Sequence, residues 1–127
     1  MNDEQYLKHC RAALGHFADE LAIRAEHLPP ADPLRELAGA FKALLDDADA
    51  LYSEGPPLVT RLFTTYPDFA PTFPRELLWF FGGECLHFMP DDEIELHRQL
   101  EELRAAAAAA DEKLDLRAAR SKLLKLQ

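Results

Sequence analysis

The chain has 127 residues, 48% of them hydrophobic and 29% charged, and 23 Asp and Glu against 14 Lys and Arg leave a formal net charge of −9. A chain of this length buries roughly two-thirds of its unfolded surface, so we expect one globular domain over residues 1–127. This composition excludes collagen-like, mucin-like and largely disordered classes, and the negative charge argues against binding to nucleic acid or to an anionic membrane surface.

The spacing of apolar residues predicts an all-α protein. The nine prolines fall in four groups, and between these groups apolar residues recur at helical spacing. No stretch alternates as a half-buried strand does, and Val, Ile and Thr are few. We therefore predict a single-domain bundle of five to six helices. No segment reaches the 18 to 20 apolar residues that a membrane span needs.

The first two predicted helices form a long antiparallel hairpin. The first covers about residues 3–27, and the second begins at Pro33 behind Asp32 as N-cap and continues to about Ser53. A short proline-rich turn joins them, which favours antiparallel packing. The apolar seams that would face each other are Leu7, Cys10, Leu14, Phe17, Leu21 and Leu28 in the first helix and Leu34, Leu37, Phe41, Leu44, Ala48 and Leu51 in the second.

Prolines and aromatic residues dominate the middle of the chain. Pro56 and Pro57 restart a shorter helix that Pro67 must end, because proline lacks an N–H and crowds the preceding turn. Residues 67–74 then form a loop whose aromatic side chains should anchor it on the core. Eight of the twelve aromatic residues lie between Phe63 and Phe88, which places the centre of the molecule here.

Residues 74–89 are predicted as a buried central helix, since they are apolar on nearly every side after the first turn. Gly82 and Gly83 weaken such a helix by up to about 2 kcal/mol relative to alanine. Either the helix breaks there or another backbone approaches where no Cβ is allowed. We expect the close approach.

The C-terminal part predicts one long helix and one short helix. Pro90 and the acidic residues 91–93 begin the long helix, where negative charge complements the helix dipole. Its seam continues through Leu96, Leu100, Leu103, Ala107 and Ala110. A last helix starts at Asp115, and from Leu116 onward the chain carries four basic and no acidic residues. Such a basic end suits a solvated helix C-terminus, with an anion-binding tail as the alternative.

The sharpest chemical motif is Glu84 with His87, because residues three apart share a helix face, as di-metal sites in helical bundles require. Those sites need the pair twice, and no other histidine has an acid three residues before it. The alternative hypothesis is therefore a metal-binding protein or a metal-dependent hydrolase, with a divalent metal held by Glu84, His87 and Cys85. The simpler interpretation is two polar residues at the rim of a buried helix.

Other ligand combinations are weaker still. His9 and Cys10 with Cys85 and His87 supply zinc-type ligands, but adjacent helical residues point about 100° apart. The acidic runs at 46–49 and 91–93 would suit Mg²⁺ and a pyrophosphate if they faced each other on two helices. A solvated helix face and a helix N-terminus explain the two runs without a metal. No phosphate loop or nucleophile elbow occurs.

These observations favour an interaction protein over an enzyme or a cofactor-binding protein. The apolar seams exceed what a thin bundle covers, so we expect a homodimer or another protein partner, as in an adaptor, regulator or small chaperone. The acidic start of the chain, which lacks a signal peptide, and the two cysteines favour the cytoplasm. The predicted contact residues are Leu7, Leu14, Phe17 and Leu21 on the hairpin, or Tyr66, Phe69 and Phe73 on the loop.

Overall fold

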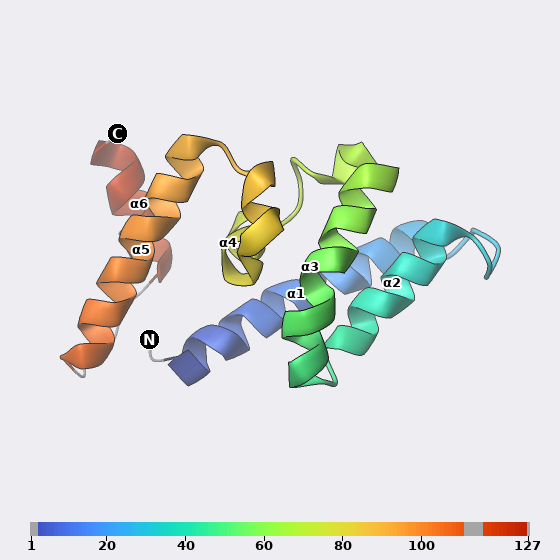
Figure 1. Cartoon of the computed structure of the whole chain (residues 1–127), viewed down its shortest axis with the longest axis horizontal. Coiled ribbons are helices and arrows are strands. Elements are labelled where there is room, and N and C mark those ends of the chain that lie inside the picture. Colours follow the sequence, from blue (N-terminus) through green and yellow to red (C-terminus); the bar gives the residue numbers. More distant parts are fainter. Residues whose placement is uncertain (1–2, 111–115, 127) are drawn as a thin grey trace. The chain divides into compact units, whose positions relative to one another are not determined.

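A computed structural model describes residues 3–110 and 116–126. Throughout these residues the regular elements are helices, which confirms the all-α class (Figure 1). In chain order they are α1 (Asp3–Ala25), α2 (Pro33–Leu44), α3 (Ala48–Thr65), the 3₁₀ helix η1 (Pro67–Phe69), α4 (Arg75–Phe81), the 3₁₀ helix η2 (Gly83–Phe88), α5 (Asp91–Ala109) and α6 (Leu116–Leu126). Among them none is long and apolar enough to cross a membrane.

The chain divides into two compact units. The central unit, Cys10–Phe88, holds most of α1 and every element from α2 to η2. The terminal unit joins Met1–His9 to Met89–Gln127 and holds the start of α1, α5 and α6. That residues 1–127 form a single domain remains a prediction.

In the central unit, α1 and α2 run side by side in opposite directions (Figure 1). The rings of Phe17 and Phe41 meet edge to face, with centroids 5.7 Å apart. The start of α2 is as predicted: the Leu34 N–H donates to the Asp32 carboxylate at 3.0 Å, and Pro33 occupies the first turn. Capping and burial of the seam residues therefore work together in this hairpin.

The second predicted helix ends earlier than expected, at Leu44 instead of about Ser53. Asp47 is the reason, because its carboxylate accepts the N–H groups of Asp49 and Ala50 at 3.0 and 3.2 Å. A side chain in this role caps a new helix, α3, so the chain turns between Leu44 and Ala48. The prediction of one continuous helix was wrong because the sequence pattern passes through this turn without losing its period.

Helix α3 in turn continues through Pro56 and Pro57, where the sequence predicts a restart. Interior prolines cost a helix about 3 kcal/mol or more, so other contacts must compensate. Residues on both sides of the prolines supply them, since Leu51, Val59, Leu62 and Phe63 are all buried. Burial of each large side chain contributes roughly 1.5 to 3 kcal/mol, so the four together outweigh the cost of the prolines.

Aromatic rings build the centre of this unit, as predicted. Phe73, from the loop before α4, is 1% exposed and lies between Phe17 and Phe63, at centroid distances of 4.7 and 5.3 Å. Phe63 also meets Phe88 at 4.7 Å. The proline-rich loop is thus held on the core by its aromatic side chain.

The predicted central helix breaks at the two glycines, so the expectation of a close approach was wrong. Gly82 and Gly83 have φ angles of 63° and 51°, which glycine adopts at little cost. A Cβ at Gly83 would meet nothing within 4 Å, and one at Gly82 would lie 3.8 Å from the nearest atom. The pair ends α4 and starts η2 through its backbone freedom.

In the terminal unit, α5 begins with the three acidic residues 91–93 as predicted, but its buried stripe differs. Arg104 is buried, whereas Leu103 of the predicted seam is 41% exposed. The Arg104 guanidinium donates to Asp3 at 2.7 Å and to Glu101, and it lies 4.5 Å from the Tyr6 ring centroid. These partners make burial of the cation possible. The predicted start of the last helix, Asp115, lies outside the described residues.

Candidate functional site

The three residues of the predicted metal motif lie on η2, but Cys85 does not face the same side as Glu84 and His87. Glu84 and His87 are exposed, and residues three apart eclipse each other in a 3₁₀ helix, so the two share one side. Cys85 is instead buried in the central unit. Throughout residues 3–110 and 116–126, no group of three or more His, Cys, Asp or Glu could hold a metal ion. The geometry therefore adds no third ligand to this pair.

Burial sets the chemistry of Cys85. Desolvation, helped by the charge of Glu84, raises the pKa of its thiol from 9.0 to about 11. A thiol with a raised pKa is a poor nucleophile near neutral pH, because the thiolate is the reactive form. Cys10 is buried as well. Neither cysteine therefore has the exposure that a reactive thiol needs.

We expect both thiols to resist a disulfide reagent such as DTNB at pH 8 in the folded protein and both to react once it is denatured. Because the folded pKa of Cys85 lies above its unfolded value, the protonated thiol favours folding below about pH 9, and this contribution is lost as the pH rises towards 11. Thiol counting at pH 8 and urea unfolding at pH 8 and 10 check both statements. One thiol that reacts rapidly in the native protein contradicts them.

The two acidic runs have separate structural roles. Asp46 and Asp47 lie in the turn between α2 and α3, and Asp47 caps α3 with Asp49 in the first turn. The run at 91–93 forms the first turn of α5. Both runs place carboxylates over helix N-termini, where they complement the dipole. The first run was expected on a solvated helix face and instead forms a turn.

The hairpin stripe that was predicted as a contact surface is part of the core. Leu14, Phe17 and Leu21 are buried, and so is Phe73 of the loop. The rings of Phe17 and Phe73 pack against each other within the fold. The other three predicted contact residues, Leu7, Tyr66 and Phe69, are partly exposed. A contact through these three residues stays a prediction.

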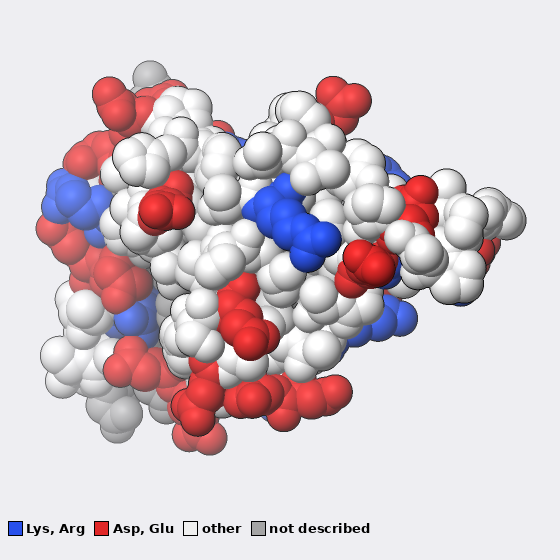
Figure 2. Space-filling view, turned by 45° about the vertical axis from the view of Figure 1, so that its right-hand side comes forward, with Lys and Arg blue, Asp and Glu red and all other residues white. Residues whose placement is uncertain are grey.

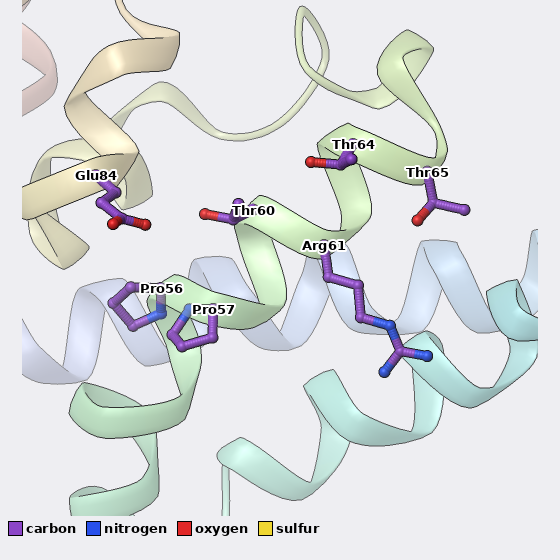
Figure 3. A pocket seen from close by; sticks show the side chains of 7 residues that line it. All are labelled: Pro56, Pro57, Thr60, Arg61, Thr64, Thr65 and Glu84. Atoms are coloured by element: carbon purple, nitrogen blue, oxygen red, sulfur yellow. The ribbon is translucent and has the colours of Figure 1, made fainter.

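Two open pockets adjoin on the outer side of α3. One, of about 590 Å³, lies between α3 and η2 and is lined by Pro56, Pro57, Thr60, Arg61, Thr64, Thr65 and Glu84 (Figure 3). The other, of about 450 Å³, lies between α2 and α3 and is lined by Ala40, Ala43, Ser53, Glu54, Pro57, Leu58 and Arg61. They share Pro57 and Arg61, so together they form one groove, which we call the α3 groove.

The side chains of the α3 groove have a distinct arrangement. In Figure 3 the hydroxyl of Thr60 and the carboxylate of Glu84 point toward each other, while Arg61 extends away toward α2. Thr60 Oγ1 is buried and has no hydrogen-bond partner in the described part of the chain. Arg61 forms a 4.0 Å ion pair with Glu36, in which both side chains are more than half exposed. The Glu84 end thus offers an exposed carboxylate beside proline rings.

The prolines and two glutamates give the groove its character. Pro56 and Pro57 place apolar rings along it. Glu84 lines one pocket and Glu54 the other. The groove therefore combines apolar walls with two carboxylates.

The central unit, which carries the groove, is acidic overall. The central unit contains twelve Asp and Glu against six Lys and Arg. On the face drawn in Figure 2, acidic side chains predominate and the described basic ones do not merge into a broad patch. A ligand with positive charge and some apolar surface complements such a groove.

Sequence reasoning missed this groove because it interpreted Gly55, Pro56 and Pro57 as a helix boundary. The sequence did contain one sign that no helix starts at Pro56. None of the usual N-cap residues, Ser, Thr, Asp or Asn, occupies the two positions before it. Gly55 is buried under Phe81, so the glycine is needed for packing inside α3, and the prolines that follow lie within the helix.

Comparison with known proteins identifies the family. No curated protein and no solved structure matches the chain. One family model, described as PA2817-like, matches residues 3–127. This match spans both compact units. The chain therefore belongs to the PA2817-like family.

Proposed function

We propose that the protein is a protein-interaction module, an adaptor or regulator without catalysis of its own, and that the α3 groove binds a basic, partly apolar segment of a protein partner. The observation that carries this proposal is that the two pockets share Pro57 and Arg61 and that a glutamate lines each of them. Both cysteines are free thiols, which is compatible with a cytoplasmic location.

The chemistry of the groove selects the sign of the ligand. A lysine or arginine side chain has an apolar stem that suits the proline rings and a donor head that suits the carboxylates of Glu54 and Glu84. An acidic segment would be repelled by a unit with twice as many acidic as basic residues. Arg61 lines both pockets, where its guanidinium can donate a hydrogen bond to a backbone carbonyl of the bound segment.

Two designed peptides test the proposal: amphipathic eleven-residue helices of Leu and Lys, and of Leu and Glu. We expect the Leu/Lys peptide to shift backbone amide resonances of α3 and η2 in the ¹⁵N-labelled full chain, and the Leu/Glu peptide to shift none. Shifts spread evenly over the acidic surface, or equal binding of both peptides, would overturn the proposal.

A matched pair of variants sharpens this test. Glu54→Gln with Glu84→Gln should weaken Leu/Lys binding by roughly tenfold, since each exposed ion pair contributes up to about 1 kcal/mol. Glu20→Gln with Glu26→Gln removes the same charge from exposed positions outside the groove and should leave the affinity unchanged. An equal loss in both variants would mean that net charge, and not the groove, governs binding.

A further inference from the structure

We infer that the occupant of the α3 groove is helix α6 of a second copy of this chain, an inference that rests on the proposed function. The composition of α6 is the first argument. Leu116–Leu126 carries four basic residues and no acidic one, and no other part of the sequence has such a stretch. The charge of α6 is therefore opposite to that of the central unit, which carries the groove.

The exposed face of α6 is the second argument. Helices α5 and α6 pack against each other, and among residues 118–124, whose burial is described, Ala119 and Leu123 are partly buried. Arg120 and Leu124 remain exposed, and Leu124, at 50%, is one of the few large apolar side chains exposed in the described residues. Residues four apart lie on the same helix face, so a guanidinium and an isobutyl group are presented together.

This pair matches the groove in chemistry. The larger pocket is lined by the ring of Pro57, which provides an apolar surface, and by the carboxylate of Glu84, which provides an acceptor. We place Leu124 of one copy against Pro57 of the other, and Arg120 against Glu84. Both groups are available while α6 stays packed on α5.

Each copy has one groove and one α6, so a mutual exchange between two copies would form the same contact twice and double the buried surface. A single helix face in a groove buries less than a stable interface usually requires, so the reciprocal arrangement is the one that the physics favours.

Charge reversal on full-length protein tests the inference. By sedimentation across micromolar concentrations, the wild type should have twice the 14.4 kDa monomer mass. Arg120→Glu and Glu84→Arg should each weaken the dimer at least tenfold, and an equimolar mixture of the two variants should recover a dimer. This recovery also shows that both variants fold. Lys122→Glu is the matched control, since Lys122 is exposed on the opposite side of α6 and should not affect the dimer.

Each result has a definite meaning. A monomeric wild type, equal effects of Arg120→Glu and Lys122→Glu, or no recovery in the mixture would overturn the inference. Binding of the Leu/Lys peptide to the groove of a monomeric wild type would overturn the dimer while the proposed function stands. If the dimer forms as inferred, the same peptide should dissociate it, because both compete for one groove. Failure of the peptide to bind even the Arg120→Glu variant would contradict the proposed function itself.

Discussion

Replacing Phe73 by alanine should lower the free energy of unfolding by about 3 to 5 kcal/mol, the usual cost of deleting a buried phenylalanine ring. Phe73 is 1% exposed and its ring contacts those of Phe17 and Phe63. Removal leaves a cavity between α1, α3 and the loop that rigid neighbours cannot refill. Urea unfolding followed by circular dichroism measures the loss.

Phe69→Ala is the control, because Phe69 belongs to the same loop but is only partly buried. Its ring lies 5.6 Å from the Arg24 guanidinium and 6.3 Å from the ring of Tyr66. We expect at most about half the loss of the Phe73 variant, in proportion to the smaller apolar area. Equal losses would contradict the central position of Phe73. A stable Phe73 variant with altered self-association would assign this ring to a contact surface, as the sequence alone suggested.

Gly55→Ala should destabilise the fold by about 1 to 3 kcal/mol, although alanine is the better helix former. A Cβ at this position would lie 2.4 Å from Cε1 of Phe81 and 3.0 Å from two further atoms of that ring. The added methyl group must displace the ring and with it α4. The midpoint of thermal unfolding reports the change.

Gly39→Ala provides the matched control within α2, where a Cβ would meet nothing within 4 Å. This variant should stabilise the protein by about 0.5 to 1 kcal/mol, because alanine loses less backbone entropy than glycine in a helix. A second change, Phe81→Leu, should recover part of the stability lost in Gly55→Ala. If Gly55→Ala proves neutral or stabilising, the packing of α3 against Phe81 is not as the structure has it.

Several features followed from the sequence because they depend on local chemistry. Asp32 and Pro33 predicted the start of α2, and the acidic residues 91–93 predicted the start of α5. The helical period of apolar residues predicted the all-α class and the core positions of Leu14 and Phe41. Capping groups and one-sided hydrophobicity act within a few residues, so a linear pattern contains them.

The remaining boundaries depend on which of two local solutions the packing selects. Asp47 is a residue type that commonly caps helices, but the apolar period continues across it. Only the tertiary structure shows that the preceding helix ends there. At the two glycines, the sequence allowed a close approach, which we expected, or a break, and the positive φ angles show the break. Arg104 is buried only because Asp3 and Tyr6, about a hundred residues away in the chain, surround it.

The candidate site belongs to this second group. Sequence reasoning considered Glu84 for its spacing from His87, whereas the structure associates it with Pro57 and Thr60 of α3. The sequence by itself determined the helical class, the local starts of helices and the negative charge, since these depend on neighbouring residues and on composition. Only the tertiary structure decided that α3 passes through its prolines and carries a groove, because burial of Leu51, Val59 and Leu62 outweighs a local preference to break.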